Sequence, residues 1–190
     1  STFNRSVLLT DSAYTVALSL REMQSLGLSS RKFGNVQNAG YGGRFTANSA
    51  AYTLFADTGG GSPSSNCQFG QGAPSGSPEA KPGNCVYNAG TDGIVRSYTF
   101  SRGYTISQIC GTTVSTGAEY CSNDSTPLTA LDIVFVRSNT TDSIMTGQRS
   151  GVSVPLSKAE IYIRDAEGVS TRGICVSQVG QVSVALTSCP

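Results

Sequence analysis

The sequence contains no histidine and no tryptophan. Without histidine, the chain lacks the usual general base near neutral pH and the most common transition-metal ligand. Catalysis by Ser-His-Asp or Cys-His groups is therefore excluded. The six cysteines show no C-x-x-C spacing, so nothing indicates a zinc ribbon or a thioredoxin-like redox site. The sequence predicts a protein that is not an enzyme, with no catalytic residue, metal site or cofactor.

Charge is also scarce. Lys and Arg number 13 and Asp and Glu number 12, which gives a net charge of +1, and only 13% of residues are charged. This balance does not predict a nucleic-acid or acidic-membrane partner. No apolar run approaches the roughly 20 residues that span a bilayer. Scarce charge with abundant glycine, serine and threonine is typical of extracellular β-rich proteins.

Two short patterns leave a chemical alternative open. Asp57 in "ADTGGG" and Asp92 in "GTDG" fit a calcium site, but a complete calcium loop is missing and Asp-Gly pairs usually mark turns. Ser29 and Lys32 match the S-x-x-K pattern of penicillin-binding enzymes, but its companion motifs are missing. Turns and a polar helix end are the preferred interpretations.

An even number of cysteines, separated by loops, predicts disulfide bonds and an oxidising compartment. We expect nearest neighbours along the chain to pair, because each pair closes a short loop or hairpin: Cys67 with Cys85, Cys110 with Cys121, and Cys175 with Cys189. Other pairings, and six reduced cysteines, are the alternatives. Export of such a chain leads us to expect a signal upstream of Ser1.

The segment "YTVALSLREMQSLGLSSRKF" predicts an amphipathic helix near the start of the chain, ending around residues 28–32. One apolar stripe at helical spacing contains Leu9, Ala13, Val16, Ala17, Leu20, Met23 and Gly27. Leu8, Leu18 and Leu26 lie off that stripe. They predict either a second contact of the helix or single exposed leucines, which are common on protein surfaces.

After the helix, the pattern changes to strands. The predicted strand segments are residues 42–57, which contain two strands, and 93–100, 104–110, 128–137, 159–165, 172–178 and 181–186. We expect one domain over residues 1–190, with the helix in 1–33, an irregular Gly/Ser/Pro-rich insertion at 59–93 and antiparallel strands in 94–190. The predicted fold class is α+β, with the amphipathic helix packed on an antiparallel sheet.

Several segments resemble one family in the order in which they occur. "VALSLREMQSLGLSSRKF", "AAYTLFADTGGG", "LDIVFVRSN" and "AEIYIRDAEGVSTRGICVSQVGQVSV" resemble type IV pilins and type II secretion pseudopilins, especially the pseudopilin-H and FimT-like branch. The resemblance covers both ends of the chain and misses the cysteine-bearing insertion. It implies a pilin-like fold, in which residues 1–33 are the second half of the pilin helix. The hydrophobic first half, with Glu at its fifth position, would lie upstream of Ser1.

The resemblance implies a structural subunit of an extracellular filament, either a major pilin, a minor pilin or a pseudopilin, serving adhesion, motility or DNA uptake. Its partners would be other pilin subunits and the pilus assembly machinery, with membrane contact only through the missing N-terminal helix. The implied assembly helix comprises Leu8, Leu9, Ala13, Val16, Leu18, Leu20, Met23 and Leu26.

The alternative is a minor pilin or secreted module that binds DNA, a sugar or a cell surface through its loops. DNA-binding members of the branch are expected to use arginines in the final hairpin. Gln181 and Ser183 occupy those places here, which weakens the DNA interpretation.

Overall fold

A computed structural model describes residues 2–59, 83–137 and 143–190, with the side chains described from Asn4 onward. The chain begins with helix α1 (Thr2–Leu28) and continues as ten strands, all of them paired antiparallel: β1 (Gly40–Phe45), β2 (Ala51–Asp57), β3 (Gly93–Thr99), β4 (Thr105–Thr113), β5 (Glu119–Cys121), β6 (Leu128–Phe135), β7 (Ile144–Arg149), β8 (Val152–Arg164), β9 (Thr171–Ser177) and β10 (Val182–Ala185).

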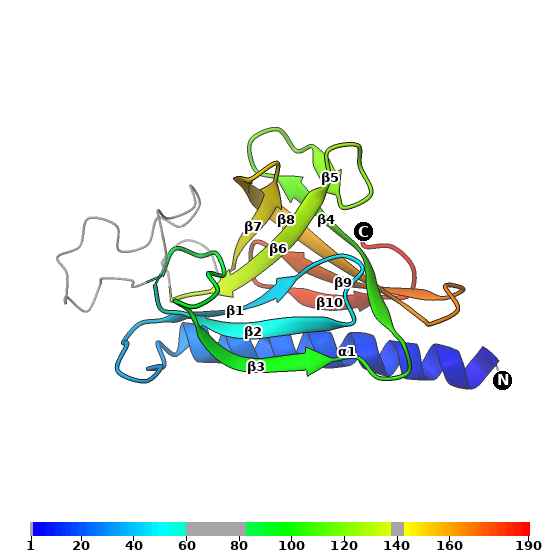
Figure 1. Cartoon of the computed structure of the whole chain (residues 1–190), viewed down its shortest axis with the longest axis horizontal. Helices are drawn as coiled ribbons and strands as arrows, with labels where there is room; N and C mark the ends of the chain where they lie inside the picture. Colours follow the sequence, from blue (N-terminus) through cyan, green and yellow to red (C-terminus); the bar gives the residue numbers. More distant parts are fainter. Residues whose placement is uncertain (1, 60–82, 138–142) are drawn as a thin grey trace.

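The strands form one sheet with a branch. Its main path runs in the order β10-β9-β8-β7-β6-β1-β2-β3, while β4 pairs with β8 and β5 pairs with β4. Strand β8 is 13 residues long and changes neighbours along its length. Val152–Leu156 pairs with β7, whereas Lys158–Arg164 lies between β4 and β9. This exchange of neighbours turns the sheet on itself, and Figure 1 shows the resulting curl above α1.

The predicted fold class, a pilin-like α+β arrangement, is wrong. The described residues are mostly β, with one helix and a curled antiparallel sheet that forms a half-barrel, rather than a pilin helix on a sheet. The physical reason lies in β7, β5 and the first half of β8, which the sequence patterns did not predict. β7 pairs with both β6 and β8. Without that strand, the predicted elements lack the connection between β6 and β8 on which the curl depends.

Helix α1 packs along the sheet against β1, β6, β9 and β10. The expected stripe is the buried one: Leu9, Ala13, Val16, Leu20 and Met23 are fully buried in the main core. The helix ends at Leu28, as expected, and Ser30 adopts a left-handed backbone conformation that stops it. Within the described residues, no helix is both long enough and apolar enough to cross a membrane.

Polar contacts also fix the orientation of α1. Arg172 of β9 donates hydrogen bonds to Thr10 Oγ1 at 2.9 Å and to Ser6 Oγ at 2.6 Å. Farther along the helix, Arg21 donates to the carbonyl of Val182 and Gln24 to that of Gly180. These bonds join the helix to β9 and to the final hairpin, so α1 presents one defined face outward.

Candidate assembly face and binding cleft

The residues expected in the assembly helix divide into two sets. Leu9, Ala13, Val16, Leu20 and Met23 are covered by the protein's own sheet, whereas Leu18 is 60% exposed. Leu8 and Leu26 were expected on a second face, but they are half-buried and pack against the main core. The curled sheet covers a wider arc of the helix than the apolar stripe alone indicates.

The outward face of α1 carries a second apolar line. Val7, Tyr14 and Leu18 are 44%, 54% and 60% exposed. Their spacing of seven and four residues places them on one side of the helix. Val7 and Tyr14 were not predicted on this face, although their i, i+7, i+11 spacing with Leu18 was a usable signal. We call Val7, Tyr14 and Leu18 the outer stripe.

Two of the expected disulfides are present. Cys110 is bonded to Cys121, and Cys175 is bonded to Cys189. Cys85 is also disulfide-bonded, but its expected partner, Cys67, lies outside the described residues. The first disulfide closes the β4–β5 hairpin, and the second fixes the segment after β10 to β9.

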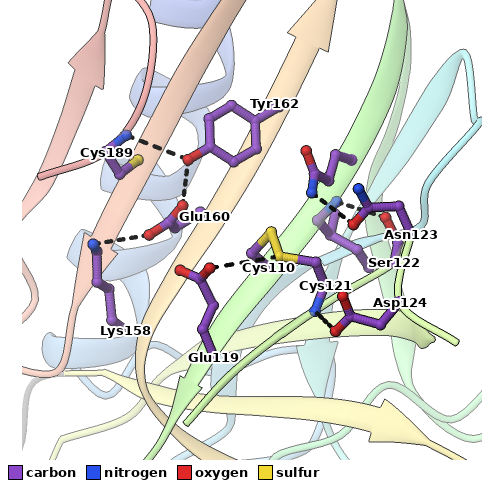
Figure 2. Close-up of a disulfide and its surroundings, with 12 residues drawn as sticks. Cys110, Glu119, Cys121, Ser122, Asn123, Asp124, Lys158, Glu160, Tyr162 and Cys189 are labelled. Carbon is purple, nitrogen blue, oxygen red and sulfur yellow. Dashed lines mark hydrogen bonds and ion pairs between the residues drawn. A yellow bond between two sulfur atoms is a disulfide. The ribbon is translucent and has the colours of Figure 1, made fainter. Parts of the chain in front are cut away.

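Between these two disulfides the surface forms a cleft of about 460 Å³. Its position follows from strand register, since Cys121, Cys110, Glu160 and Cys175 are successive partners across β5, β4, β8 and β9. Glu160 therefore lies between the two disulfides. Figure 2 shows it beside Lys158 and Tyr162, with Glu119 of β5 facing the same space.

Hydrogen bonding and charge fix the side chains of the cleft. The Glu160 side chain is 5% exposed, forms an ion pair of 2.8 Å with Lys158 and accepts a hydrogen bond from the Tyr162 hydroxyl. Burial raises the pKa of Tyr162 to about 12, and the hydrogen bond to Glu160 and the charges of Glu160 and Glu119 act in the same direction. The cleft is therefore a polar site in which Tyr162 stays protonated and donates.

The cleft residues were not predicted as a site, although the pattern that places them was visible. In "KAEIYIRD", Lys158, Glu160 and Tyr162 alternate with three core residues, Ala159, Ile161 and Ile163. The alternation puts the polar residues on the face of the sheet away from the core. Only strand pairing shows that this face lies between two disulfides.

The calcium alternative gains no support from the contacts of its two carboxylates. Asp57 accepts hydrogen bonds from the backbone N–H groups of Asn84 and Cys85, and Asp92 accepts them from Thr58, Gly59 and Asn88. Both carboxylates hold loop backbone, and no group of three potential metal ligands occurs in the described parts of the chain.

The serine–lysine alternative also gains no support. The hydroxyl of Ser29 donates to the carbonyl of Leu26 at 3.0 Å, which is an ordinary contact at a helix end.

Comparison with known proteins identifies no relative: no family model, no curated protein and no solved structure matches this chain.

Proposed function

We propose that this protein is a structural subunit of an extracellular type IV pilus-like filament and that it assembles through the outer stripe of α1. The observation that carries the proposal is the exposure of Val7, Tyr14 and Leu18 on one line of a helix whose opposite face is already buried. The resemblance of the sequence to pilins also supports a filament subunit, whereas the pilin-like fold, which the structure contradicts, lends it no support.

The outer stripe fits a subunit contact for a physical reason. Three exposed apolar side chains on one side of a helix gain free energy when a neighbour removes them from water. The helix cannot turn this face inward, because Arg172, Arg21 and Gln24 bind it to the sheet and to the final hairpin. A neighbouring subunit that packs along α1 would cover the outer stripe.

The disulfides support an extracellular setting. Cys110–Cys121 and Cys175–Cys189 are typical of proteins that fold in an oxidising compartment. In the proposed filament, α1 lies toward neighbouring subunits, and the sheet with its disulfides lies toward the medium. The partners would be other subunits and the assembly machinery, and any membrane contact would come from a hydrophobic helix upstream of Ser1.

The first experiment is to determine the coding sequence upstream of Ser1. A prepilin cleavage site followed by a hydrophobic helix with Glu at its fifth position would support the proposal. An ordinary cleavable signal peptide directly before Ser1 would overturn it.

The second experiment tests the outer stripe in the full-length chain. We expect Tyr14→Ser with Leu18→Ser to abolish or strongly reduce filaments seen by electron microscopy, at unchanged protein level. The control is Val169→Ser, which removes an apolar side chain that is 78% exposed between β8 and β9. Filament yield equal to the unmodified protein in the Tyr14/Leu18 variant would contradict assembly through this face.

A secreted binding module is the second candidate, and the cleft between the disulfides favours it. DNA fits this cleft poorly, because Glu119 and Glu160 would repel phosphate. The final hairpin is also in contact with α1, because Arg21 and Gln24 of the helix donate hydrogen bonds to the carbonyls of Val182 and Gly180. A binding function of this chain therefore points to a ligand other than DNA.

A further inference from the structure

We propose that the cleft between the two disulfides is a binding site for a small neutral saccharide of one or two sugar units. The proposal goes beyond filament assembly and does not depend on it, because the cleft and the outer stripe share no residue.

The cleft occupies the face of β4, β8 and β9 that points away from the core. Ala159, Ile161 and Ile163 of β8 are fully buried on the inner face, and Lys158, Glu160 and Tyr162 alternate with them. A volume of about 460 Å³ falls within the roughly 300–1,000 Å³ of small-molecule sites. The cleft is therefore large enough for a small ligand without any rearrangement of the core.

The floor of the cleft is rigid. Glu160 is 4% exposed and is held from two sides, by the Lys158 ammonium and the Tyr162 hydroxyl. Tyr162 in turn accepts a hydrogen bond from the backbone N–H of Cys189 at 3.3 Å. Fixed polar groups bind a ligand with little loss of conformational entropy.

Both walls are also fixed. On one side, the Cys110–Cys121 disulfide closes the hairpin that carries Glu119, and Asp124 accepts a hydrogen bond of 2.7 Å from the Cys121 N–H (Figure 2). On the other side, the Cys175–Cys189 disulfide holds the segment with Thr187 and Ser188 against β9. Oxidation of both pairs thus builds the site.

The lining groups determine the ligand class. Carboxylate oxygens of Glu119 can accept hydrogen bonds from a ligand, and the hydroxyls of Thr171, Thr187 and Ser188 can donate and accept them. The Lys158 ammonium, which has three N–H groups, already donates to the Pro190 carbonyl and pairs with Glu160, so it can offer one further donor. Sugar hydroxyls also donate and accept, so they match such a mixed set. Glu119 and Glu160 disfavour phosphate and other anions, and Lys158 already neutralises one of the two carboxylates.

Glu119 is the residue best suited to contact the ligand. It is exposed, and its Oε2 lies 3.9 Å from Cys121 Sγ, which carries no proton because it is in a disulfide. Among the described residues Glu119 has no ion-pair partner, so its oxygens are available to sugar hydroxyls. A hydrogen bond to a charged group is stronger than one between neutral groups.

The test uses saturation-transfer difference NMR on the oxidised chain, with glucose, galactose, mannose and N-acetylglucosamine as separate probes. We expect at least one sugar to bind saturably with a Kd of roughly 1–10 mM, and Glu119→Gln to weaken it by about tenfold or more. The matched control is Glu22→Gln, which removes an exposed carboxylate from α1, on the core side of the sheet. This control should leave the Kd unchanged.

Three results would overturn the proposal. The first is that none of the four sugars binds. The second is an equal effect of Glu119→Gln and Glu22→Gln, which would place the ligand elsewhere. The third is that protonated ethanolamine binds more tightly than any of the sugars and abolishes the sugar signal on competition. This result would make the cleft a site for organic cations.

Discussion

The carboxylate of Asp57 accepts a hydrogen bond of 2.7 Å from the backbone N–H of Cys85. This contact ties the end of β2 to a residue 28 positions later, close to the start of β3. Burial raises the pKa of Asp57 to about 7, the charges of Asp92 and Asp132 act in the same direction, and the hydrogen bonds from Cys85 and Asn84 oppose the shift.

The raised pKa of Asp57 predicts a pH dependence of stability. Its pKa in the unfolded chain is about 4, so between about pH 4 and pH 7 the folded state binds more protons than the unfolded state. The free energy of unfolding should therefore rise as the pH falls from 8 to 5, by roughly 2 kcal/mol from this residue. Asp132, with a pKa also raised to about 7 by burial, adds in the same direction.

Urea unfolding at pH 5, 6, 7 and 8 measures this effect. Asp57→Asn should reduce the slope of the profile, because an amide does not titrate and the contribution of Asp132 remains. The control is Asp11→Asn, on the exposed face of α1. A protein that becomes steadily more stable from pH 5 to pH 8 would contradict the role given to Asp57.

Arg172 should be important for docking of α1. Its guanidinium binds Thr10 and Ser6 on the helix and also the carbonyl of Leu186. Arg172→Met keeps most of the side-chain stem but removes these bonds, and we expect a loss of about 1–3 kcal/mol in the free energy of unfolding. The control is Arg5→Met, whose ion pair with Glu167 is exposed and contributes little. Equal urea midpoints for the two variants would disprove the docking role.

Gly27 lies where the backbone of α1 closely approaches that of β6. A Cβ atom at this position would lie 2.0 Å from the carbonyl oxygen of Phe135. Gly27→Ala should therefore destabilise the protein by about 1–3 kcal/mol, although the same change in a free helix stabilises it by about 1 kcal/mol. The shift of the thermal unfolding midpoint shows whether Gly27→Ala stabilises or destabilises the protein. The control is Ser25→Ala, on the exposed side of the helix. A higher midpoint for Gly27→Ala would show that the helix is not held against Phe135.

The Cys175–Cys189 disulfide joins residues 14 apart in sequence. Replacing both by serine should lower the free energy of unfolding by about 3 kcal/mol, because the unfolded chain regains the entropy that loop closure removes. The comparison is the Cys110/Cys121 double serine variant, whose separation of 11 predicts a similar loss. Urea unfolding without reductant measures both, and an unchanged midpoint in either variant would contradict the prediction for that pair.

Local patterns were sufficient for several features of this protein. The spacing of Leu9, Val16 and Leu20 predicted the buried face of the helix, because a helix places such residues on one side whatever they contact. Nearest-neighbour pairing predicted both described disulfides, because short loops bring cysteines together at low entropic cost. The predicted strand segments correspond to β1, β2, β3, β4, β6, β9, β10 and the second half of β8.

The local elements thus followed from the amino-acid order alone: where the helix lies, which face it buries, most of the extended segments and the pairing in the two described disulfides. The extended segments that did not follow from it are β5, β7 and the first half of β8. The curl of the sheet could not be predicted from local patterns, because it depends on register between distant segments, such as Tyr41 opposite Phe135. Tertiary packing also half-buries Leu8 and Leu26 against the main core, and cross-strand register places Glu160 between two disulfides. Strands pair through backbone N–H and C=O groups, which nearly every residue carries. The side-chain periodicity of one segment therefore does not specify which other segment it pairs with.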